Sequence, residues 1–294
     1  MPPSSVAGWT ARAVSLPACV AALVVGGCAS PTAVTTPALD GSKCSKEALG
    51  TIYPGILTFG ADQPVYPPWY MGDDPANGEG FEAALAYAIA AELRFKPDDV
   101  RWVRVPFNAA LEPGAKAFDV NLSQFSITDQ RRAAVDFSTP YFDVTQAVVT
   151  VRSSPAANAR TLDDLRGVRL GAQVGSTSYS AAAALSGTIP VAAFNTNVDA
   201  KMALVDGEID AVVADLPTAF SVANELSGGV MVGQLPGPGG ADQSGVEQFG
   251  IVLDHGSSLT RCVSWAVDSL RTDGTLAALQ KRWLADAGRA PLLS

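Results

Sequence analysis

The chain has 294 residues, enough for one large domain or two of medium size. Hydrophobic residues make up 48% of the chain and charged residues 17%, which is the composition of a folded protein with substantial cores rather than of a disordered one. The formal net charge of −9 argues against nucleic acid and anionic membrane surfaces as partners, because both require a basic face. The single histidine, His255, is expected in a solvated turn, and we predict no metal and no other cofactor.

Residues 1–27 have the features of a bacterial export signal. Arg12 supplies the positive charge, and the uncharged apolar run at 13–25 is shorter than the roughly 20 residues of a membrane span. The run ends in VGGC at 25–28, which resembles a lipobox: small residues let a peptidase approach the backbone, and the cysteine thiolate accepts a diacylglyceryl group. We therefore expect an extracytoplasmic protein, lipid-anchored to the bacterial cell membrane through Cys28. An ordinary signal peptide with an incidental cysteine is the alternative.

Residues 28–44 are expected to form the lipidated cysteine and a flexible tether, because the segment is rich in Thr, Pro and Ala and has no hydrophobic periodicity. Of the four cysteines, Cys19 lies in the signal and Cys28 is the lipid site. Cys44 and Cys262 remain as an even pair in an oxidising compartment. We predict a disulfide between them, which joins the start of the folded body to a late helix.

From residue 56 onward, short apolar runs alternate with helical patterns, which is typical of an α/β fold. In the first half we predict strands at 56–59, 100–105, 119–122 and 147–151 and a helix at 81–93. A second unit begins near Thr161, which caps a short helix at 162–166 reciprocally with Asp164. We then predict strands at 168–172, 209–213 and 249–253, an Ala-rich helix after Thr177, helices at 197–205 (capped by Asn197), 259–270 and 275–283, and a Pro/Gly loop at 235–240. The runs at 147–151 and 249–253 are expected to cross between the two units.

Several motifs occur together in one order along the chain. They are DVNLSQFSITDQR at 119–131 continuing into VDFSTPY at 135–141, YPPW at 66–69, GFE at 80–82, TLDDLRG at 161–167, GST at 175–177, DGEIDAVVAD at 206–215, DGT at 273–275 and KRW at 281–283. Together they resemble the family 3 extracellular solute-binding proteins, which serve polar amino-acid ABC importers.

The resemblance implies a two-lobed periplasmic-binding-protein fold of type II (Venus-flytrap) with two hinge crossings. Lobe 1 would comprise 45–146 and 250–294, and lobe 2 would comprise 147–249. The implied function is capture of an amino acid or close derivative between the lobes and delivery to an ABC importer permease. We expect a monomer that closes on its ligand, with no nucleic-acid partner.

An α-amino acid carries a carboxylate and an ammonium at fixed separation, so its site needs a cation and an anion. Arg131 suits the carboxylate because its guanidinium bonds it bidentately. Asp215 follows a buried-type strand and suits the ammonium. From the family pattern and this chemistry we predict a ligand site of Asp62, Tyr66, Trp69, Phe107, Gln124, Ser126, Arg131, Gln173, Thr177 and Asp215.

Each of these residues also has a structural interpretation. Arg131 could be a solvated cation at a helix start, and Asp215 could cap the helix that opens at Pro217. The aromatic residues could be ordinary core. The chain departs from the family pattern at Glu82, where Asp is usual and where we expect little effect on binding. It also departs at Gln173, where several relatives carry a cation, which leaves the ligand side chain open.

Two other functions compete with transport. Some relatives of this fold are cyclohexadienyl dehydratases, which act on arogenate or prephenate. Glu79 and Glu247 are acidic candidates for such an enzyme, but no acid/base pair follows from their spacing. A ligand-presenting sensor subunit is the second alternative.

Overall fold

The computed structural model describes residues 41–237, 245–285 and 290–294. The predicted signal peptide, Cys28 and the tether up to residue 40 lie outside these residues, as does the second half of the predicted loop at 235–240. All described residues belong to one compact unit, which contains two five-stranded sheets. Within the described ranges, no helix combines the length and apolar character that a membrane crossing needs.

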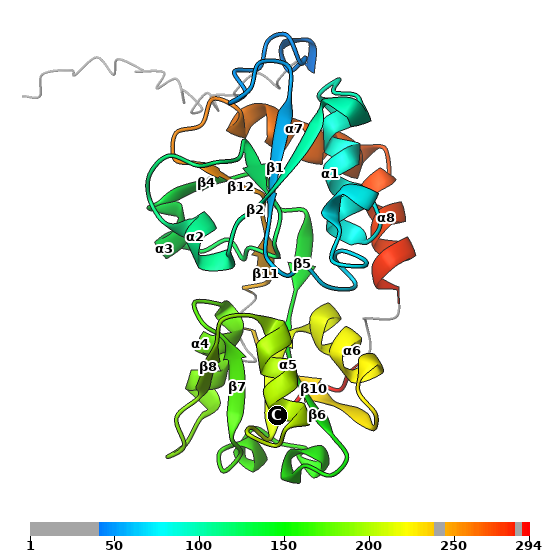
Figure 1. Cartoon of the computed structure of the whole chain (residues 1–294). Coiled ribbons are helices and arrows are strands. Elements are labelled where there is room, and N and C mark those ends of the chain that lie inside the picture. The colour runs from blue at the N-terminus through cyan, green and yellow to red at the C-terminus, as the bar shows by residue number, and fades with distance from the viewer. Residues whose placement is uncertain (1–40, 238–244, 286–289) are drawn as a thin grey trace, which may run out of the picture. The chain divides into compact units, whose positions relative to one another are not determined.

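The first sheet forms the centre of lobe 1, and its strands run in the order β2-β1-β3-β12-β4 (Figure 1). β1 is parallel to β2 and β3, and β12 is antiparallel to β3 and β4. The bounds are β1 Leu57–Ala61, β2 Val100–Arg104, β3 Val120–Asn121, β4 Val135–Phe137, β12 Val252–Asp254, α1 Phe81–Glu92, α2 Phe107–Leu111, α3 Asp129–Arg132, α7 Thr260–Thr272 and α8 Thr275–Leu284, with short 3-10 turns at Gly41–Lys43, Pro75–Asn77 and Pro97–Asp99.

The second sheet forms the centre of lobe 2, with strand order β10-β6-β9-β7-β8. Its parallel pairs are β7 with β8 and with β9, while β6 is antiparallel to β9 and β10. The bounds are β6 Gln146–Val151, β7 Leu170–Gln173, β8 Ala192–Phe194, β9 Ala211–Asp215, β10 Gly229–Gln234, α4 Thr177–Leu185, α5 Asn197–Val205 and α6 Leu216–Glu225, with 3-10 turns at Pro155–Asn158 and Asp163–Leu165.

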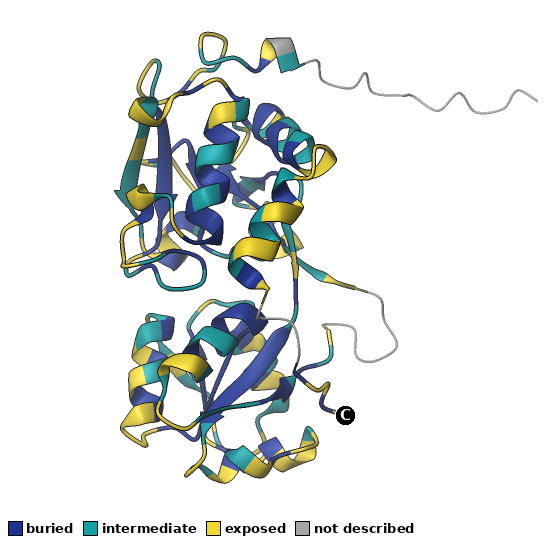
Figure 2. Ribbon diagram, turned by 90° about the vertical axis from the view of Figure 1, so that its right-hand side faces the viewer, coloured by how far each residue is buried: buried dark blue, intermediate teal, exposed yellow. Residues whose placement is uncertain are grey.

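Lobe 2 has apolar cores on both faces of its sheet. Figure 2 shows buried strands and partly exposed helices in this lobe. Val148 and Val213 belong to the core that includes Ala182 of α4. Val149 and Val212, their sequence neighbours, belong to the opposite core with α5. This alternation explains why β6 and β9 read as continuous apolar runs, since a strand covered on both faces has no polar side.

The two lobes are connected by a small two-stranded sheet, β5 (Phe142–Val144) with β11 (Glu247–Phe249). The predicted crossing at 147–151 is wrong in place: β6 lies wholly in the lobe 2 sheet, and the chain leaves lobe 1 just before it, through β5. The predicted strand at 249–253 is two strands, because Gly250 and Ile251 interrupt it between β11 and β12.

The C-terminal segment departs from the predicted lobe boundary. Residues 290–294 were assigned to lobe 1, but Leu293 N donates to Gln234 O and Gln234 N donates to Pro291 O. Leu293 is buried in a lobe 2 core. The segment thus packs on lobe 2 beside β10, although α8, which precedes it, packs in lobe 1 with α1 and α7.

The long helices confirm the sequence patterns. In α1, Phe81, Leu85 and Ile89 are all fully buried, as is Leu93 just after it. The helix begins after Gly80, whose φ is 101° and where a Cβ atom would lie 2.4 Å from a backbone oxygen of Trp69, so glycine is required there.

Two shorter predictions need correction. The stretch at 162–166 is only a 3-10 turn, although the reciprocal bonds between Thr161 and Asp164 are present. The helix at 197–205 is capped by Thr196 and not by Asn197, so the side chain of Asn197 is not used as a cap.

Cys44 and Cys262 form the predicted disulfide, with a Cα–Cα distance of 5.4 Å. It joins the start of the described chain to α7. Both cysteines are buried in the lobe 1 core.

Candidate functional site

A small cavity lies between the lobes, at the ends of β7, β9 and the segments that follow β1 and β3. Its lining residues are Tyr66, Phe107, Ser123, Gln124, Ser126, Arg131, Gln173, Ser176, Thr177, Ser178, Asn197 and Asp215. Eight of the ten predicted ligand residues are in this set. The cavity has a volume of about 10 Å³, at the lower limit of the roughly 10–15 Å³ that a single water needs. In this arrangement of the lobes the polar side chains therefore contact one another across the cleft.

Arg131 extends from α3, whose first turn is capped by the Thr128 side chain. Its Nη1 donates to Ser126 O at 2.7 Å and its Nη2 donates to Gly175 O, in lobe 2, at 3.0 Å. The guanidinium lies over the Phe107 ring, 5.4 Å from its centroid. Among the described residues it makes no salt bridge. Burial lowers the pKa of Arg131, but an arginine remains charged. This is a partly buried cation that can accept an anionic partner, not a solvated one.

Asp215 is the last residue of β9 and is 8% exposed. It stands where an N-cap of α6 would stand, yet its side chain makes no capping bond. Instead its Oδ1 accepts from Gln146 Nε2 at 2.8 Å. Burial and the nearby Glu247 carboxylate raise the pKa of Asp215 to about 8. A ligand ammonium is the kind of group that would stabilise its ionised form.

A cluster of hydrogen bonds connects the hinge to this carboxylate. Gln146 Nε2 also donates to Glu247 Oε2 at 2.9 Å, and Gln146 Oε1 accepts from Ser178 Oγ at 2.6 Å. Ser126 Oγ donates to Glu247 Oε1 at 2.5 Å and lies 3.2 Å from Thr177 Oγ1. The carboxylates of Asp215 and Glu247 thus both accept a hydrogen bond from the side-chain nitrogen of Gln146.

Asp62 does not line the cavity but contacts two residues that do, Phe107 and Gln173, and is 6% exposed. Its Oδ1 accepts from the backbone N–H groups of Gln63 and Phe107, and its Oδ2 has a longer contact of 3.5 Å with Gln173 Nε2. Burial raises the pKa of Asp62, against these hydrogen bonds. Gln173 Nε2 also donates to Asn195 O at 3.1 Å.

Tyr66 and Gln124 form a polar wall of the cavity. Tyr66 Oη donates to Gln124 Oε1 at 2.9 Å and accepts from Asn197 Nδ2, in lobe 2, at 2.7 Å. Behind them, the fully buried Glu82 accepts from the backbone N–H and the side-chain Nε2 of Gln124 and from Tyr141 Oη. Gln124 needs this support because its φ is 53°, an uncommon conformation for a residue with a side chain.

Trp69 is the second predicted ligand residue that does not line the cavity. It is fully buried in the lobe 1 core, with Phe81, Phe142 and Phe249 around its ring at centroid distances of 5.6–6.0 Å. Its Nε1 donates to Thr218 Oγ1 of lobe 2 at 2.8 Å. The alternative interpretation, an ordinary core residue, fits this environment.

Several polar residues of the cleft were not in the predicted set: Ser123, Ser176, Ser178, Gln146, Asn197 and Glu247. The sequence pattern predicts Asn197 as a helix cap and offers Glu247 only as an acid of the enzymatic alternative. The sequence position of Gln146 could have indicated a role in the cleft, because it is a polar residue at the start of a buried, β-branched run.

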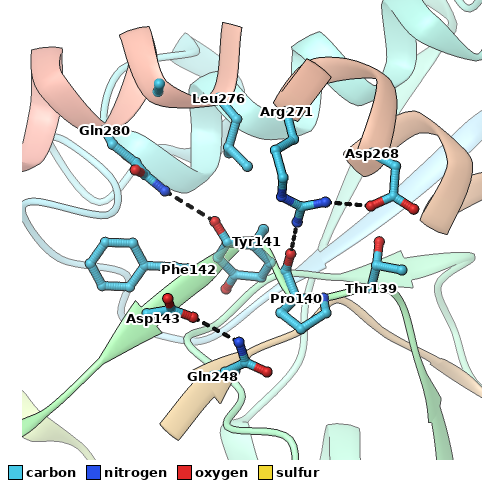
Figure 3. Close-up of a pocket in the computed structure, with 11 residues that line it drawn as sticks. Thr139, Pro140, Tyr141, Phe142, Asp143, Gln248, Asp268, Arg271, Leu276 and Gln280 are labelled. Carbon is cyan, nitrogen blue, oxygen red and sulfur yellow. Dashed lines mark hydrogen bonds and ion pairs between the residues drawn. The ribbon is translucent and has the colours of Figure 1, made fainter. Parts of the chain in front are cut away.

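Two larger cavities lie nearby, and the second of them shares Gln146, Thr177 and Glu247 with the polar cluster. One, of about 500 Å³, lies between the hinge strands and the helices α7 and α8, where Arg271 and Gln280 donate to the carbonyl oxygens of Pro140 and Tyr141 (Figure 3). The other, of about 530 Å³, is mainly apolar and extends from Thr177 along α4. Within the described ranges, no group of acidic, histidine or cysteine residues is arranged to hold a metal.

Residues 57–286 match the family model of the bacterial extracellular solute-binding proteins, family 3. The chain belongs to this family. Among its relatives, the L-arginine-binding protein of Pseudomonas aeruginosa is 30% identical over 255 residues, which cover 81% of this chain and 95% of that protein. The L-cystine-binding protein TcyJ of Escherichia coli K12 is 26% identical over 234 residues, covering 78% and 82%.

Solved structures of the same kind have the same fold. An ancestral arginine-binding protein bound to glutamine matches with a TM-score of 0.65 and 31% identity, covering 79% of this chain and 98% of that one. An ancestral amino-acid-binding protein described as a precursor of cyclohexadienyl dehydratase matches with a TM-score of 0.63 and 30% identity, covering 78% and 95%. The two-lobed fold predicted from the motifs is thereby confirmed, and the homologues are amino-acid-binding proteins.

Proposed function

We propose that this family member is an extracytoplasmic lipoprotein that captures a basic amino acid between its lobes and delivers it to an ABC importer. The observation that carries the proposal is that Arg131 of lobe 1 and Asp215 of lobe 2 line one cavity. A cation and an anion on opposite lobes are the pair that an α-carboxylate and an α-ammonium require, and only a closed arrangement satisfies both.

The α-carboxylate would bind the guanidinium of Arg131 bidentately, exchanging places with the backbone oxygens that Arg131 now contacts. Thr177, at the first turn of α4, offers a hydroxyl and a helix N-terminus on the lobe 2 side. The α-ammonium would take the place of Gln146 Nε2 on Asp215. Phe107 and Tyr66 would then flank the aliphatic part of the ligand.

The charge balance of the cleft supports a basic side chain. Once Arg131 and Asp215 are assigned to the α-groups, Asp62 and Glu247 remain as carboxylates of the described cleft, with no salt-bridge partner among the described residues. Asp62 is buried and Glu247 is partly exposed. A cationic side chain compensates such charge, whereas a glutamate side chain adds to it. The relative named for L-arginine points to the same ligand class.

The volume of the cavity supports a hinged mechanism. Because about 10 Å³ holds no amino acid, the ligand would enter with the lobes apart and close them by exchanging internal hydrogen bonds for its own. The VGGC motif at 25–28 supports lipid anchoring at Cys28, and family membership supports delivery to an importer permease.

A thermal-shift screen of the purified protein against all L-amino acids, followed by calorimetry on each hit, tests the binding proposal. A ligand at 100 times its Kd adds about 2.7 kcal/mol of stability, which shifts the Tm of a protein this size by several degrees. Stabilisation by L-arginine, L-lysine or L-ornithine supports the proposal. Stabilisation by none of the amino acids contradicts it. Mass spectrometry of the membrane-extracted protein tests the anchor, since a mature Cys28 without acyl mass contradicts it.

A further inference from the structure

Four side chains form a continuous hydrogen-bonded series across the cleft: Glu82, Gln124, Tyr66 and Asn197. The backbone N–H of Gln124 donates to Glu82 Oε1 at 2.8 Å, and Gln124 Nε2 donates to Glu82 Oε2. Tyr66 Oη donates to Gln124 Oε1 at 2.9 Å, and Asn197 Nδ2 donates to Tyr66 Oη at 2.7 Å. The first three residues belong to lobe 1 and the last to lobe 2.

Glu82 sets the direction of this series. An ionised carboxylate only accepts hydrogen bonds, so Gln124 must turn its amide nitrogen towards Glu82 and its carbonyl oxygen towards Tyr66. The single hydroxyl hydrogen of Tyr66 is then used on Gln124. Tyr66 is left as an acceptor, which orients the amide nitrogen of Asn197 towards it.

A second contact holds Asn197 in the same orientation. Its Nδ2 also donates to Gln173 Oε1 at 3.1 Å. If Gln173 turned its Nε2 towards Asn197, it would lose the hydrogen bond that Nε2 donates to Asn195 O. Tyr66 and Gln173 therefore both accept a hydrogen bond from the side-chain nitrogen of Asn197.

The remaining atom, Asn197 Oδ1, is buried and accepts no hydrogen bond from any described residue. Asn197 is 9% exposed and lines the cavity. A buried acceptor without a donor destabilises the site unless a ligand supplies one. Its neighbour Asp62, whose Oδ2 has only the 3.5 Å contact with Gln173, is likewise an acceptor with capacity for a donor.

We propose that Asn197 is a specificity-determining residue whose Oδ1 accepts from the side-chain N–H group of the ligand, and that Glu82 is the positioning residue that fixes this polarity through Gln124 and Tyr66. The inference rests on the proposed amino-acid-binding function and deepens it. It assigns a role to Glu82, the departure from the family pattern that the sequence had suggested was unimportant for binding. The donor-bearing ligand that it selects is a basic amino acid.

The test measures L-arginine affinity by calorimetry at pH 8. Burial and the negative charge of Asp62 raise the pKa of Glu82 to about 7, against the hydrogen bonds from Tyr141 and Gln124 that lower it. The carboxylate is therefore mainly ionised at pH 8. The variants are Asn197→Ala, Asn197→Asp, Glu82→Gln and the double variant with Glu82→Gln and Asn197→Ala. Asn108→Ala is the matched control, because Asn108 also bridges the lobes, donating to Val174 O, but is exposed.

Asn197→Ala should raise the Kd about 10- to 100-fold, the effect of one lost hydrogen bond to a charged group. Asn197→Asp keeps an acceptor but loses the donations to Tyr66 and Gln173, so it should weaken binding, though less than Asn197→Ala does. The control should remain within about 3-fold of the wild type. Glu82→Gln, which permits the series to reverse, should raise the Kd in the wild-type background and have no further effect in the Asn197→Ala background. Unliganded Tm values check that each variant folds.

Three results would overturn the inference. They are an Asn197→Ala effect no larger than that of the control, additive effects of Glu82→Gln and Asn197→Ala, or preference of the wild type for L-glutamate over L-arginine. Each leaves amino-acid binding itself intact. If the wild type binds no L-amino acid, the proposed function fails and this inference fails with it.

Discussion

Arg131 of lobe 1 reaches across the cleft to Gly175 of lobe 2, with 3.0 Å between its Nη2 and the glycine oxygen. The same side chain is the expected partner of the ligand carboxylate. We therefore expect the ligand carboxylate to replace this contact between the lobes when it binds.

Arg131→Ala should raise the Kd of L-arginine by at least about 100-fold, since both charged hydrogen bonds to the ligand carboxylate are lost. Arg132→Ala is the matched control, because Arg132 is adjacent and exposed, and its affinity should remain within about 3-fold of the wild type. Calorimetry measures both. Equal affinities of wild type and Arg131→Ala would remove Arg131 from the site.

The pair Asp215 and Glu247 predicts proton release on binding. The pKa of Asp215 is raised from 3.8 to about 8, so the folded protein binds more protons than the unfolded chain across that interval. Its contribution to stability without ligand is therefore full below about pH 4 and declines as the pH rises towards about 8. A ligand ammonium favours the ionised form, so binding at pH 7 should expel a proton and the affinity should rise from pH 6 to pH 8.

Calorimetry at pH 7 in buffers of different ionisation enthalpy measures this proton release. Glu247→Gln should reduce it, because the Glu247 charge is one of the causes of the shift, and Asp215→Asn should abolish it. Identical binding heats for the wild type in phosphate and Tris would contradict the assignment of the ammonium to this pair.

The disulfide should matter for stability and not for binding. Cys44 and Cys262 close a loop with a sequence separation of 218 residues, so replacing both by alanine should lower the free energy of unfolding by about 2–5 kcal/mol. Neither residue lines the cleft cavity, and the Kd should stay unchanged. Thermal unfolding with and without reductant checks this, because the reduced wild type and the double variant should have the same Tm. A tenfold loss of affinity in the double variant would show that lobe 1 is distorted.

Trp69 provides a test of lobe closure that leaves the ligand contacts in place. Trp69→Phe keeps the ring inside the aromatic cluster but removes the hydrogen bond to Thr218. We expect the free energy of ligand binding to become less favourable by about 0.5–1.5 kcal/mol, which corresponds to a 2- to 13-fold rise in Kd. Thr218→Val should have the same effect, and the double variant no more. A loss above 50-fold for Trp69→Phe alone would return Trp69 to the ligand site.

The sequence was sufficient to predict the position of residues that follow from a local pattern. Strand β9 was recognisable as a buried run, and Asp215 at its end followed from the place where α/β sheets bind ligands. Arg131 followed from its position within a family motif. Cys44 and Cys262 followed from compartment and count.

Residues whose role depends on contact between distant segments could not be read in this way. Asn197 was interpreted as a helix cap, because asparagine suits that position. In the structure the N-cap is Thr196, one residue earlier, so the side chain of Asn197 is available to the cleft. Gln146 and Glu247 are 101 residues apart, and only the pairing of β5 with β11 brings them together.

The last five residues offer a practical consequence. Because 290–294 pack against β10 whereas α8 ends at Leu284 in lobe 1, two positions ten residues apart in sequence, Leu284 and Ser294, belong to different lobes. A fluorophore attached near the end of α8 and a second one fused after Ser294 would travel with opposite lobes. The distance between them would then report opening and closing of the cleft in real time, without any label on the ligand or near its site.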